Sequence, residues 1–125
     1  MNIIETKNAP AAIGPYSQAI TAGGLVYTSG QIPIDPATGS IEAADIEGQA
    51  WQAIANLAAV LSAAGSGLDK VVKATCFLVS MGDFAAFNAV YADAFPGKPA
   101  RSCVEVSALP KGALVEIEAV AELGS

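Results

Sequence analysis

The stretch PARSCVEVSALPKGALVEIEAVA, residues 99–121, decides the fold, because it contains two segments in which polar and apolar side chains alternate. The first segment covers about residues 101–107 and the second about residues 114–122. An alternation with a period of two places successive side chains on opposite faces of a β-strand. The sequence therefore predicts that the chain ends in two strands, each with one apolar face.

Upstream of these strands, residues 70–80, KVVKATCFLVS, form a short segment rich in β-branched residues, which predicts another strand. A helix is expected between this strand and the final pair, beginning after Asp83 and ending at Pro96–Gly97. Aspartate favours a helix N-cap, and proline and glycine favour a helix end. The residues expected on the apolar face of this helix are Phe84, Phe87, Tyr91 and Phe95.

A longer helix is predicted from about residue 47 to 64. Asp45 can cap its N-terminus, and Gly65 suits the position that follows its C-terminus. Residues 31–45, before the helix, contain two prolines and a glycine and are expected to be mostly loop and turn. The helical spacing predicts one apolar face made of Trp51, Ile54, Leu57, Ala58 and Leu61.

The N-terminal part contains a predicted hairpin over residues 19–29, whose turn is the pair Gly23–Gly24. A further short strand is expected at residues 2–5. The whole pattern indicates an α+β fold in a single domain that spans residues 1–125, with one mixed β-sheet and two helices on one face. The other face of the sheet must then meet solvent or another subunit.

The composition favours a protein that associates with copies of itself. Charged residues make up 14% of the 125 residues, against about a quarter in an average protein, so few charges remain to cover the surface. The net charge of −6 disfavours binding to nucleic acid, and no apolar run is long enough to span a membrane. Two cysteines without metal or disulfide spacing favour a reducing compartment. We therefore expect a cytoplasmic homo-oligomer with neither a nucleic-acid nor a membrane partner.

Two features of the composition restrict the chemistry. The chain has no histidine, which excludes the usual Ser-His-Asp and Cys-His nucleophiles and every histidine-based zinc site. It has one arginine, Arg101, so a bidentate clamp for a carboxylate has to use that residue. Without histidine, a glutamate becomes the leading candidate for a general base.

The two final strands carry most of the candidate residues. Five of them occupy the same set of alternating positions in the two strands, so we expect them on one face of the sheet. They are Arg101, Cys103, Glu105, Glu116 and Glu118. A hairpin turning near residues 109–111 would set Glu116 opposite Glu105 and Glu118 opposite Cys103. Ordinary interpretations remain open: a surface arginine, a solvated row of glutamates and a cysteine that only packs. The backbone N–H of Cys103 could serve a ligand in either case.

Other candidates lie outside these strands. Tyr16 follows a rigid Gly-Pro turn, and its hydroxyl could reach a site or merely pack over a loop. Ser29 and Gly30 end a predicted strand, where glycine allows close approach of a ligand to the backbone. Asn88 lies beside the apolar stripe of the second helix, either as a boundary residue or as a ligand contact.

Four segments resemble the RidA/YjgF family and together cover nearly the whole chain. They are NAPAAIGPYSQAI (8–20), VYTSGQIPIDPATG (26–39), DFAAFNAVYADAF (83–95) and the stretch 99–121. The last is the most specific, because P-A-R-S-C-V-E-V followed by L-V-E-I-E-A-V looks like the family signature in both residues and spacing. The connection between the second helix and Pro99 is shorter than in some members.

The resemblance implies a chorismate-mutase-like fold and a homotrimer with its sites in the clefts between subunits. It implies hydrolysis of reactive 2-imino acids and their enamine tautomers, such as 2-iminopropanoate and 2-iminobutanoate, to 2-keto acids and ammonia, with no metal or cofactor. By the family's motif, Arg101 and the backbone at Cys103 would hold the substrate carboxylate, and Glu116 would activate water. The residues that would line the site are Tyr16, Ser29, Gly30 and Asn88.

Three other functions are compatible with parts of the sequence. A non-catalytic module that binds small carboxylates would use the same residues. A ribonuclease or translation inhibitor is disfavoured by the net charge of −6 and the absence of histidine. A chorismate mutase would bind a dianion, which prefers more cationic contacts than one arginine provides, and a shared fold does not establish a shared function.

Overall fold

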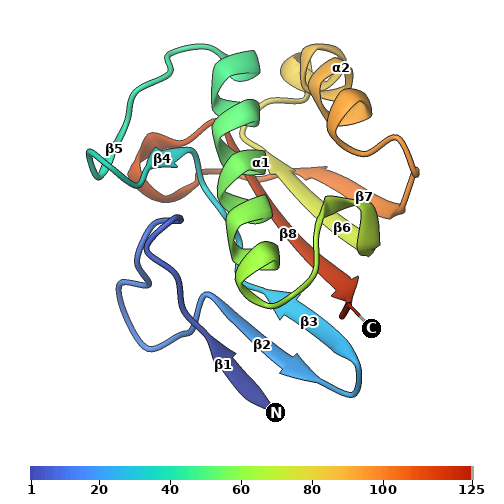
Figure 1. Ribbon diagram of the computed structural model, residues 1–125. Coiled ribbons are helices and arrows are strands. Elements are labelled where there is room, and N and C mark those ends of the chain that lie inside the picture. Colours follow the sequence, from blue (N-terminus) through green and yellow to red (C-terminus); the bar gives the residue numbers. More distant parts are fainter. Residues whose placement is uncertain (125) are drawn as a thin grey trace.

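The computed structural model describes residues 1–124 as an α+β domain built on one six-stranded mixed sheet (Figure 1). Its strand order is β1-β2-β3-β8-β6-β7, in which β7 is parallel to β6 and every other neighbouring pair is antiparallel. The predicted fold class is therefore confirmed. The strands are β1 (Asn2–Ile4), β2 (Ala19–Ala22), β3 (Leu25–Thr28), β6 (Val71–Leu78), β7 (Ala100–Glu105) and β8 (Val115–Glu122).

Two helices, α1 (Ile46–Ala63) and α2 (Phe84–Ala94), pack on the same face of this sheet (Figure 1). The segment predicted as mostly loop also contains a two-stranded hairpin of β4 (Ile34–Asp35) and β5 (Ser40–Ile41). The predicted β2–β3 hairpin is confirmed, since Gly23 and Gly24 both have positive φ angles, 59° and 80°, as its two-residue turn requires.

The predicted limits of α1 are confirmed, but its predicted apolar face is partly wrong. Asp45 accepts a hydrogen bond from the Gly48 N–H at 2.8 Å, and Gly65 follows the helix with φ of 80°. Trp51 is 47% exposed, because the buried stripe is rotated toward small residues that let the helix approach the sheet closely. This stripe consists of Ala50, Ala53, Ile54, Leu57, Val60 and Leu61, and Ala58 is only partly buried.

The start of α2 also differs from the expectation. Asp83 stands at the N-cap position, but its side chain makes no capping hydrogen bond. A short 3-10 turn, Met81–Asp83, precedes the helix instead, and the hydroxyl of Ser80 accepts the Gly82 N–H at 3.1 Å. The apolar side chains of α2 face the core as predicted, with Phe87, Tyr91 and Phe95 buried and Phe84 partly buried.

The two final strands do not form the expected hairpin, because β6 lies between them. Phe77 of β6 is paired with Glu116 on one side and with Val104 on the other. The segment 106–114 therefore crosses an end of β6 and includes a 3-10 turn, Pro110–Gly112. Glu116 is not opposite Glu105, and Glu118 is not opposite Cys103.

The register also corrects the prediction of one shared face. Paired residues of neighbouring strands project to the same side of a sheet. Cys103 pairs with the buried Cys76, which pairs with Ile117, so Arg101 and Cys103 share the helix-covered side with Ile117. Glu116 and Glu118 then project from the opposite side, although Glu105 does share the side of Arg101. The prediction of one shared face was wrong, because a shift of one residue in the register between two strands moves a set of alternating side chains to the other face of the sheet.

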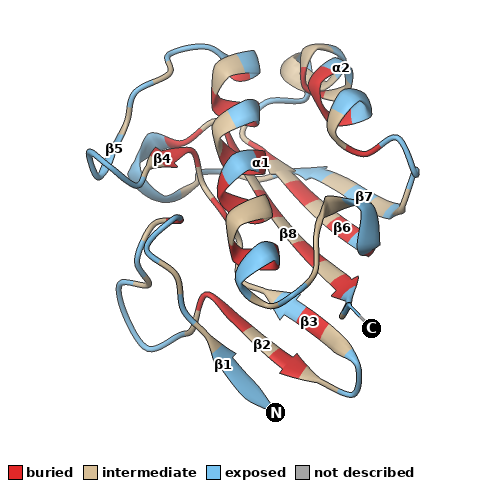
Figure 2. Cartoon of the chain, in the orientation of Figure 1, coloured by how far each residue is buried: buried red, intermediate tan, exposed pale blue. Residues whose placement is uncertain are grey.

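The core lies between α1, α2 and the sheet (Figure 2). The opposite face of the sheet carries no helix (Figure 1). It exposes apolar side chains, since Tyr27 of β3 is 45% exposed and Val104 of β7 is 44% exposed. The domain therefore leaves one apolar sheet surface without a cover of its own.

Candidate functional site

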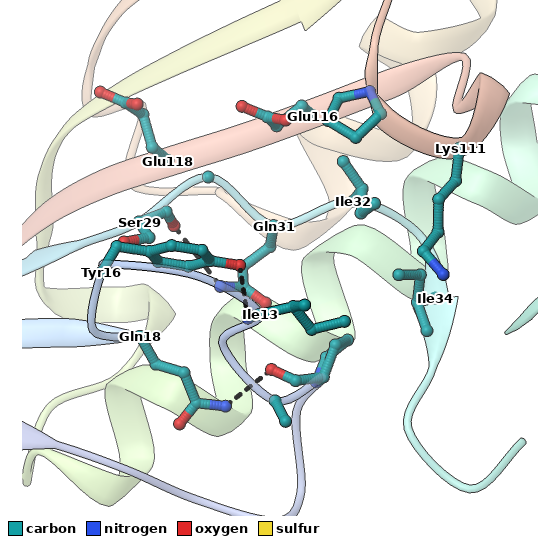
Figure 3. Close-up of a pocket in the computed structure, with 14 residues that line it drawn as sticks. Ile13, Tyr16, Gln18, Ser29, Gln31, Ile32, Ile34, Lys111, Glu116 and Glu118 are labelled. Carbon is teal, nitrogen blue, oxygen red and sulfur yellow. Dashed lines mark hydrogen bonds between the residues drawn. The ribbon is translucent and has the colours of Figure 1, made fainter. Parts of the chain in front are cut away.

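Glu116 and Glu118 project into a pocket of about 630 Å³ on the helix-free side of the sheet (Figure 3). The pocket lies between β8, the loop that follows β3, and the loop that leads into β2. Its walls combine apolar side chains, such as Ile13, Ile32 and Ile34, with the amides of Gln18 and Gln31, and Lys111 reaches in from the turn before β8 (Figure 3). The lining residues, besides the two glutamates and Lys111, are Pro10, Ala11, Ile13, Tyr16, Gln18, Ser29, Gly30, Gln31, Ile32, Ile34 and Pro110.

The Glu116 side chain packs directly on the backbone of Gly30. A Cβ placed on Gly30 would lie 2.6 Å from Cδ and 2.9 Å from Cγ of Glu116, and it would collide with Oε2 as well. The backbone of Gly30 is tied to the same strand, because the next residue, Gln31, exchanges two backbone hydrogen bonds with Ile117 at 2.8 and 3.1 Å. With the Glu116 side chain in this position, there is no room for a Cβ at position 30, whether or not a ligand also approaches it.

Three buried amide side chains hold the irregular walls of the pocket. Gln18 donates to the carbonyl oxygen of Pro10 at 2.8 Å and accepts from the Thr6 N–H at 2.7 Å. Asn56 of α1 donates to the carbonyl oxygens of Ile32 and Ile34 at 3.0 and 2.8 Å. Gln49 of α1 accepts the N–H of Leu114, two residues before Glu116, at 2.8 Å. Helix α1 thereby fixes the pocket from the far side of the sheet.

Tyr16 and Ser29 line the pocket below the two glutamates in the view of Figure 3. The Tyr16 hydroxyl accepts the Ile13 N–H at 3.3 Å, which folds the ring across the loop, and the residue is 51% exposed (Figure 3). The Ser29 hydroxyl donates to the carbonyl oxygen of Ser17 at 2.6 Å. Both hydroxyl groups therefore already have a protein partner, but the Tyr16 hydroxyl can still donate to a ligand and the Ser29 hydroxyl can still accept from one.

The environment raises the pKa of Glu116 above its usual value. Burial of the carboxylate is the main cause, and the negative charge of Glu118 adds to it. A carboxylate of raised pKa is a stronger base once it is ionised, which suits proton transfer with water.

Arg101 lies in a separate pocket of about 320 Å³, between α2 and the start of β7. Its Nη1 donates to Oδ1 of Asn88 at 2.7 Å, and its Cζ lies 4.7 Å from the ring centroid of Tyr91. The guanidinium is thus held over an aromatic ring and fixed by Asn88, and its planar fork of N–H donors suits a carboxylate. Lys98 lines the same pocket, and none of its lining residues is acidic.

The two cysteines do not fit a thiolate nucleophile. Cys76 is buried, and burial is the main reason that its pKa rises to about 12. Burial also raises the pKa of the partly exposed Cys103, against the lowering effect of Arg101. Both thiols are therefore protonated at neutral pH, which leaves the backbone of Cys103 as the part that can serve a ligand.

The residues predicted for one site are thus divided between two surfaces of the chain. Tyr16, Ser29, Gly30 and Glu116 meet around the first pocket, whereas Arg101 and Asn88 line the second, and Cys103 lies near Arg101 on the same strand face. The two pockets share no lining residue. A single copy of the chain therefore does not bring the arginine and Glu116 together.

The structure adds residues that the sequence did not place in a site. Tyr91, expected only in the core, supports the guanidinium of Arg101. Lys111 enters the glutamate pocket from a backbone with φ of 57°. Glu118, already a candidate from the sequence, lies in the same pocket. The spacing V-E-I-E signalled that Glu118 accompanies Glu116, but no sequence signal identified the positions of Tyr91 and Lys111.

Within residues 1–124 no cluster of histidine, cysteine, aspartate or glutamate has the arrangement of a metal site. In the same range, no helix combines the length and apolarity needed to cross a bilayer.

Comparison with known proteins gives consistent matches over nearly the full length. Residues 6–123 match the family described as Endoribonuclease L-PSP. A RutC family protein of Pyrococcus horikoshii is 55% identical over 120 residues, 95% of each chain. A 2-iminobutanoate/2-iminopropanoate deaminase of Salmonella typhimurium is 50% identical over 122 residues, 94% of each chain.

Solved structures also match the chain over nearly its full length. E. coli TdcF with bound serine superposes with a TM-score of 0.94 at 44% identity, covering 99% of this chain and 100% of that one. The YjgF gene product of E. coli superposes with a TM-score of 0.93 at 46% identity, covering 98% of both chains.

Proposed function

Because this chain belongs to the RidA/YjgF family, we propose that it hydrolyses small 2-imino acids, such as 2-iminopropanoate and 2-iminobutanoate, to 2-keto acids and ammonium. The relative named for this activity is 50% identical to the chain. Cys76 and Cys103 are both free thiols, which fits a reaction that takes place in a reducing cytosol.

The observation that carries this proposal is the opposite charge of the two pockets. A protonated 2-imino acid is negative at its carboxylate and positive at its nitrogen. The Arg101 pocket supplies cations and Asn88 without an acid. The other pocket supplies Glu116 and Glu118, with its lysine, Lys111, away from both carboxylates (Figure 3). A molecule bound between such surfaces would be oriented by its own charges.

The chemistry needs few groups, because a protonated imine carbon is already electrophilic. Glu116 takes a proton from water while the water oxygen forms a bond to the imine carbon, and the C=N electron pair moves to nitrogen. The proton then passes to that nitrogen. The C–N bond breaks with its electron pair leaving on ammonia while the hydroxyl oxygen forms the C=O bond, and the hydroxyl proton passes by way of Glu116 to the ammonia, which becomes ammonium. The balance is one iminium acid and one water giving one keto acid and one ammonium. The raised pKa of Glu116 suits both proton transfers.

We also propose that the active form is a homotrimer in which each site combines the Arg101 pocket of one subunit with the Glu116 pocket of the next. Two features support it. The two halves lie apart within one chain, and the helix-free side of the sheet exposes apolar side chains such as Val104 and Tyr27. A surface of this kind is typical of a contact between subunits.

The endoribonuclease description of the matching family names a different reaction. The chain carries a net charge of −6 and no histidine, and the two glutamates of the first pocket disfavour a phosphodiester there. We therefore prefer the deaminase. A non-catalytic module that binds small carboxylates would use the same two pockets, and it would differ from the deaminase only in having no turnover.

The decisive experiment measures pyruvate release from freshly generated 2-iminopropanoate with and without the protein. We expect clear acceleration by the wild type and a loss of about a hundredfold or more in turnover in Glu116→Gln, the usual scale for removal of a general base. Pyruvate should still bind to Glu116→Gln, because Arg101 is intact. Pyruvate binding without acceleration by the wild type would identify the module instead.

A further inference from the structure

The glutamate pocket contains a second carboxylate that the reaction described above does not use. Glu116 and Glu118 are two residues apart on β8, so both project from the same face of the sheet. Both are partly buried, and both line the same cavity. They are also close enough for the charge of one to act on the ionisation of the other.

Two acids in one partly buried pocket require an explanation in physical terms. Like charges brought together out of water repel each other, and that repulsion opposes folding. A bound cation would remove the repulsion. The nearest lysine in the lining, Lys111, lies at the Ile34 end of the pocket in Figure 3, away from both carboxylates. Lys73, on the same face of the neighbouring strand β6, donates to the Ser102 hydroxyl instead. The pair is therefore left to attract a positive group from a ligand.

We propose that Glu118 accepts the N–H of the protonated imine nitrogen and then holds the departing ammonium. This assignment rests on the proposed deaminase function and gives each end of the substrate an ionic partner. Arg101 of one subunit takes the carboxylate, Glu116 takes the water, and Glu118 takes the nitrogen. The nitrogen contact adds no bond change to the reaction, because Glu118 stays ionised throughout.

Other titratable groups near Glu118 come from each element that packs around it. Glu116 lies on its own strand, Tyr16 comes from the N-terminal loop, and Lys111 comes from the turn before β8. Lys73 lies on the same face of β6, where it donates to the Ser102 hydroxyl at 3.3 Å. Tyr27 of β3 and Glu122 of β8 also lie on this face, but neither lines the pocket. Glu116 is the other acid in the pocket lining, so a change at Glu118 should be felt mainly there.

The test compares two stable ligands that differ in the group carried by carbon 2. L-Alanine presents an ammonium beside its carboxylate, and pyruvate presents a neutral carbonyl. Dissociation constants are measured by calorimetry for the wild type, Glu118→Gln and a matched control, Glu122→Gln. Glu122 lies on the same strand and the same face as Glu118, but it is exposed and outside the pocket.

We expect Glu118→Gln to weaken alanine binding by about tenfold, the usual scale for a hydrogen bond between charged groups, while pyruvate binding stays within twofold. Glu122→Gln should leave both unchanged. The rate profile supplies a second readout: without Glu118 the pKa of Glu116 falls, so the acidic limb of kcat against pH moves to lower pH.

The assignment would be overturned if the ratio of alanine to pyruvate affinity were the same in the wild type and in Glu118→Gln, including the case in which both affinities fall equally. A wild type that binds no alanine would overturn it as well. Failure of the deaminase proposal is separate, because it would appear as no acceleration of pyruvate release by the wild type, whatever the affinities are.

Discussion

The carboxylate of Glu116 occupies the space in which any residue other than glycine at position 30 would carry its Cβ. The two residues come from segments far apart in the sequence and are brought together by the Gln31–Ile117 bridge. The position of the Glu116 carboxylate, the proposed base, therefore depends on the absence of a side chain at Gly30.

Gly30→Ala should consequently move the glutamate without unfolding the protein. The backbone of Gly30 is not in the left-handed region, so the added methyl group creates a local collision and no backbone strain. We expect deaminase turnover to fall by about a hundredfold, the scale associated with misplacing a reacting group by about 1 Å. Turnover and circular dichroism are measured together. Gly97→Ala, where a Cβ meets nothing within 4 Å, is the control.

A site shared between subunits predicts complementation between two inactive variants. Arg101→Lys loses the planar fork, and Glu116→Gln loses the base, so each alone should be inactive. In trimers assembled from equal amounts of both, about one quarter of the sites combine an intact Arg101 with an intact Glu116 by random association. Unfolding and refolding the mixture should restore about that share of wild-type activity. No recovery in mixed trimers would place both residues in the same subunit.

The ionisation of Glu116 should reduce stability as the pH rises. Its pKa in the folded protein is raised above the ordinary value of 4.5, so the folded state favours the protonated form. This contribution is fully present below about pH 4.5 and is lost as the pH rises through the folded-state pKa. Glu116→Gln should therefore be more stable than the wild type at neutral pH, with the difference shrinking toward pH 4. Thermal unfolding across this range measures it, and equal pH dependence in both proteins would contradict it.

Tyr91→Phe should stabilise the fold while keeping the platform under Arg101. The Tyr91 hydroxyl is buried and has no hydrogen-bond partner within residues 1–124, and burial is the main reason that its pKa rises to about 12. Removing an unpaired buried hydroxyl should raise the free energy of unfolding by about 1 kcal/mol. Denaturant unfolding gives this value. Tyr91→Leu, which removes the ring, should instead weaken pyruvate binding through loss of the contact to Arg101.

Local patterns in the sequence were sufficient for most of the secondary structure. The Gly23–Gly24 turn, the Asp45 cap and the alternation through Glu116 and Glu118 depend on neighbouring residues, so they can be identified without the rest of the fold. Trp51 was wrongly predicted on the buried face of α1. Both the apolar tryptophan and the small alanines could have faced the core, and only the packed helix shows that the alanine stripe approaches the sheet. The family motif likewise identifies candidate residues from the order of amino acids alone.

The arrangement of those candidates was decided by tertiary structure alone. Strand order is set by long-range pairing, and the insertion of β6 between β7 and β8 separated Arg101 from Glu116 and sent them to opposite faces. The contact of Glu116 with Gly30 and the support of Arg101 by Tyr91 join residues that no local pattern connects. Sequence periodicity determines which side chains share a face of one strand. Only pairing between strands determines which face of the sheet that is, because a shift of one residue reverses it.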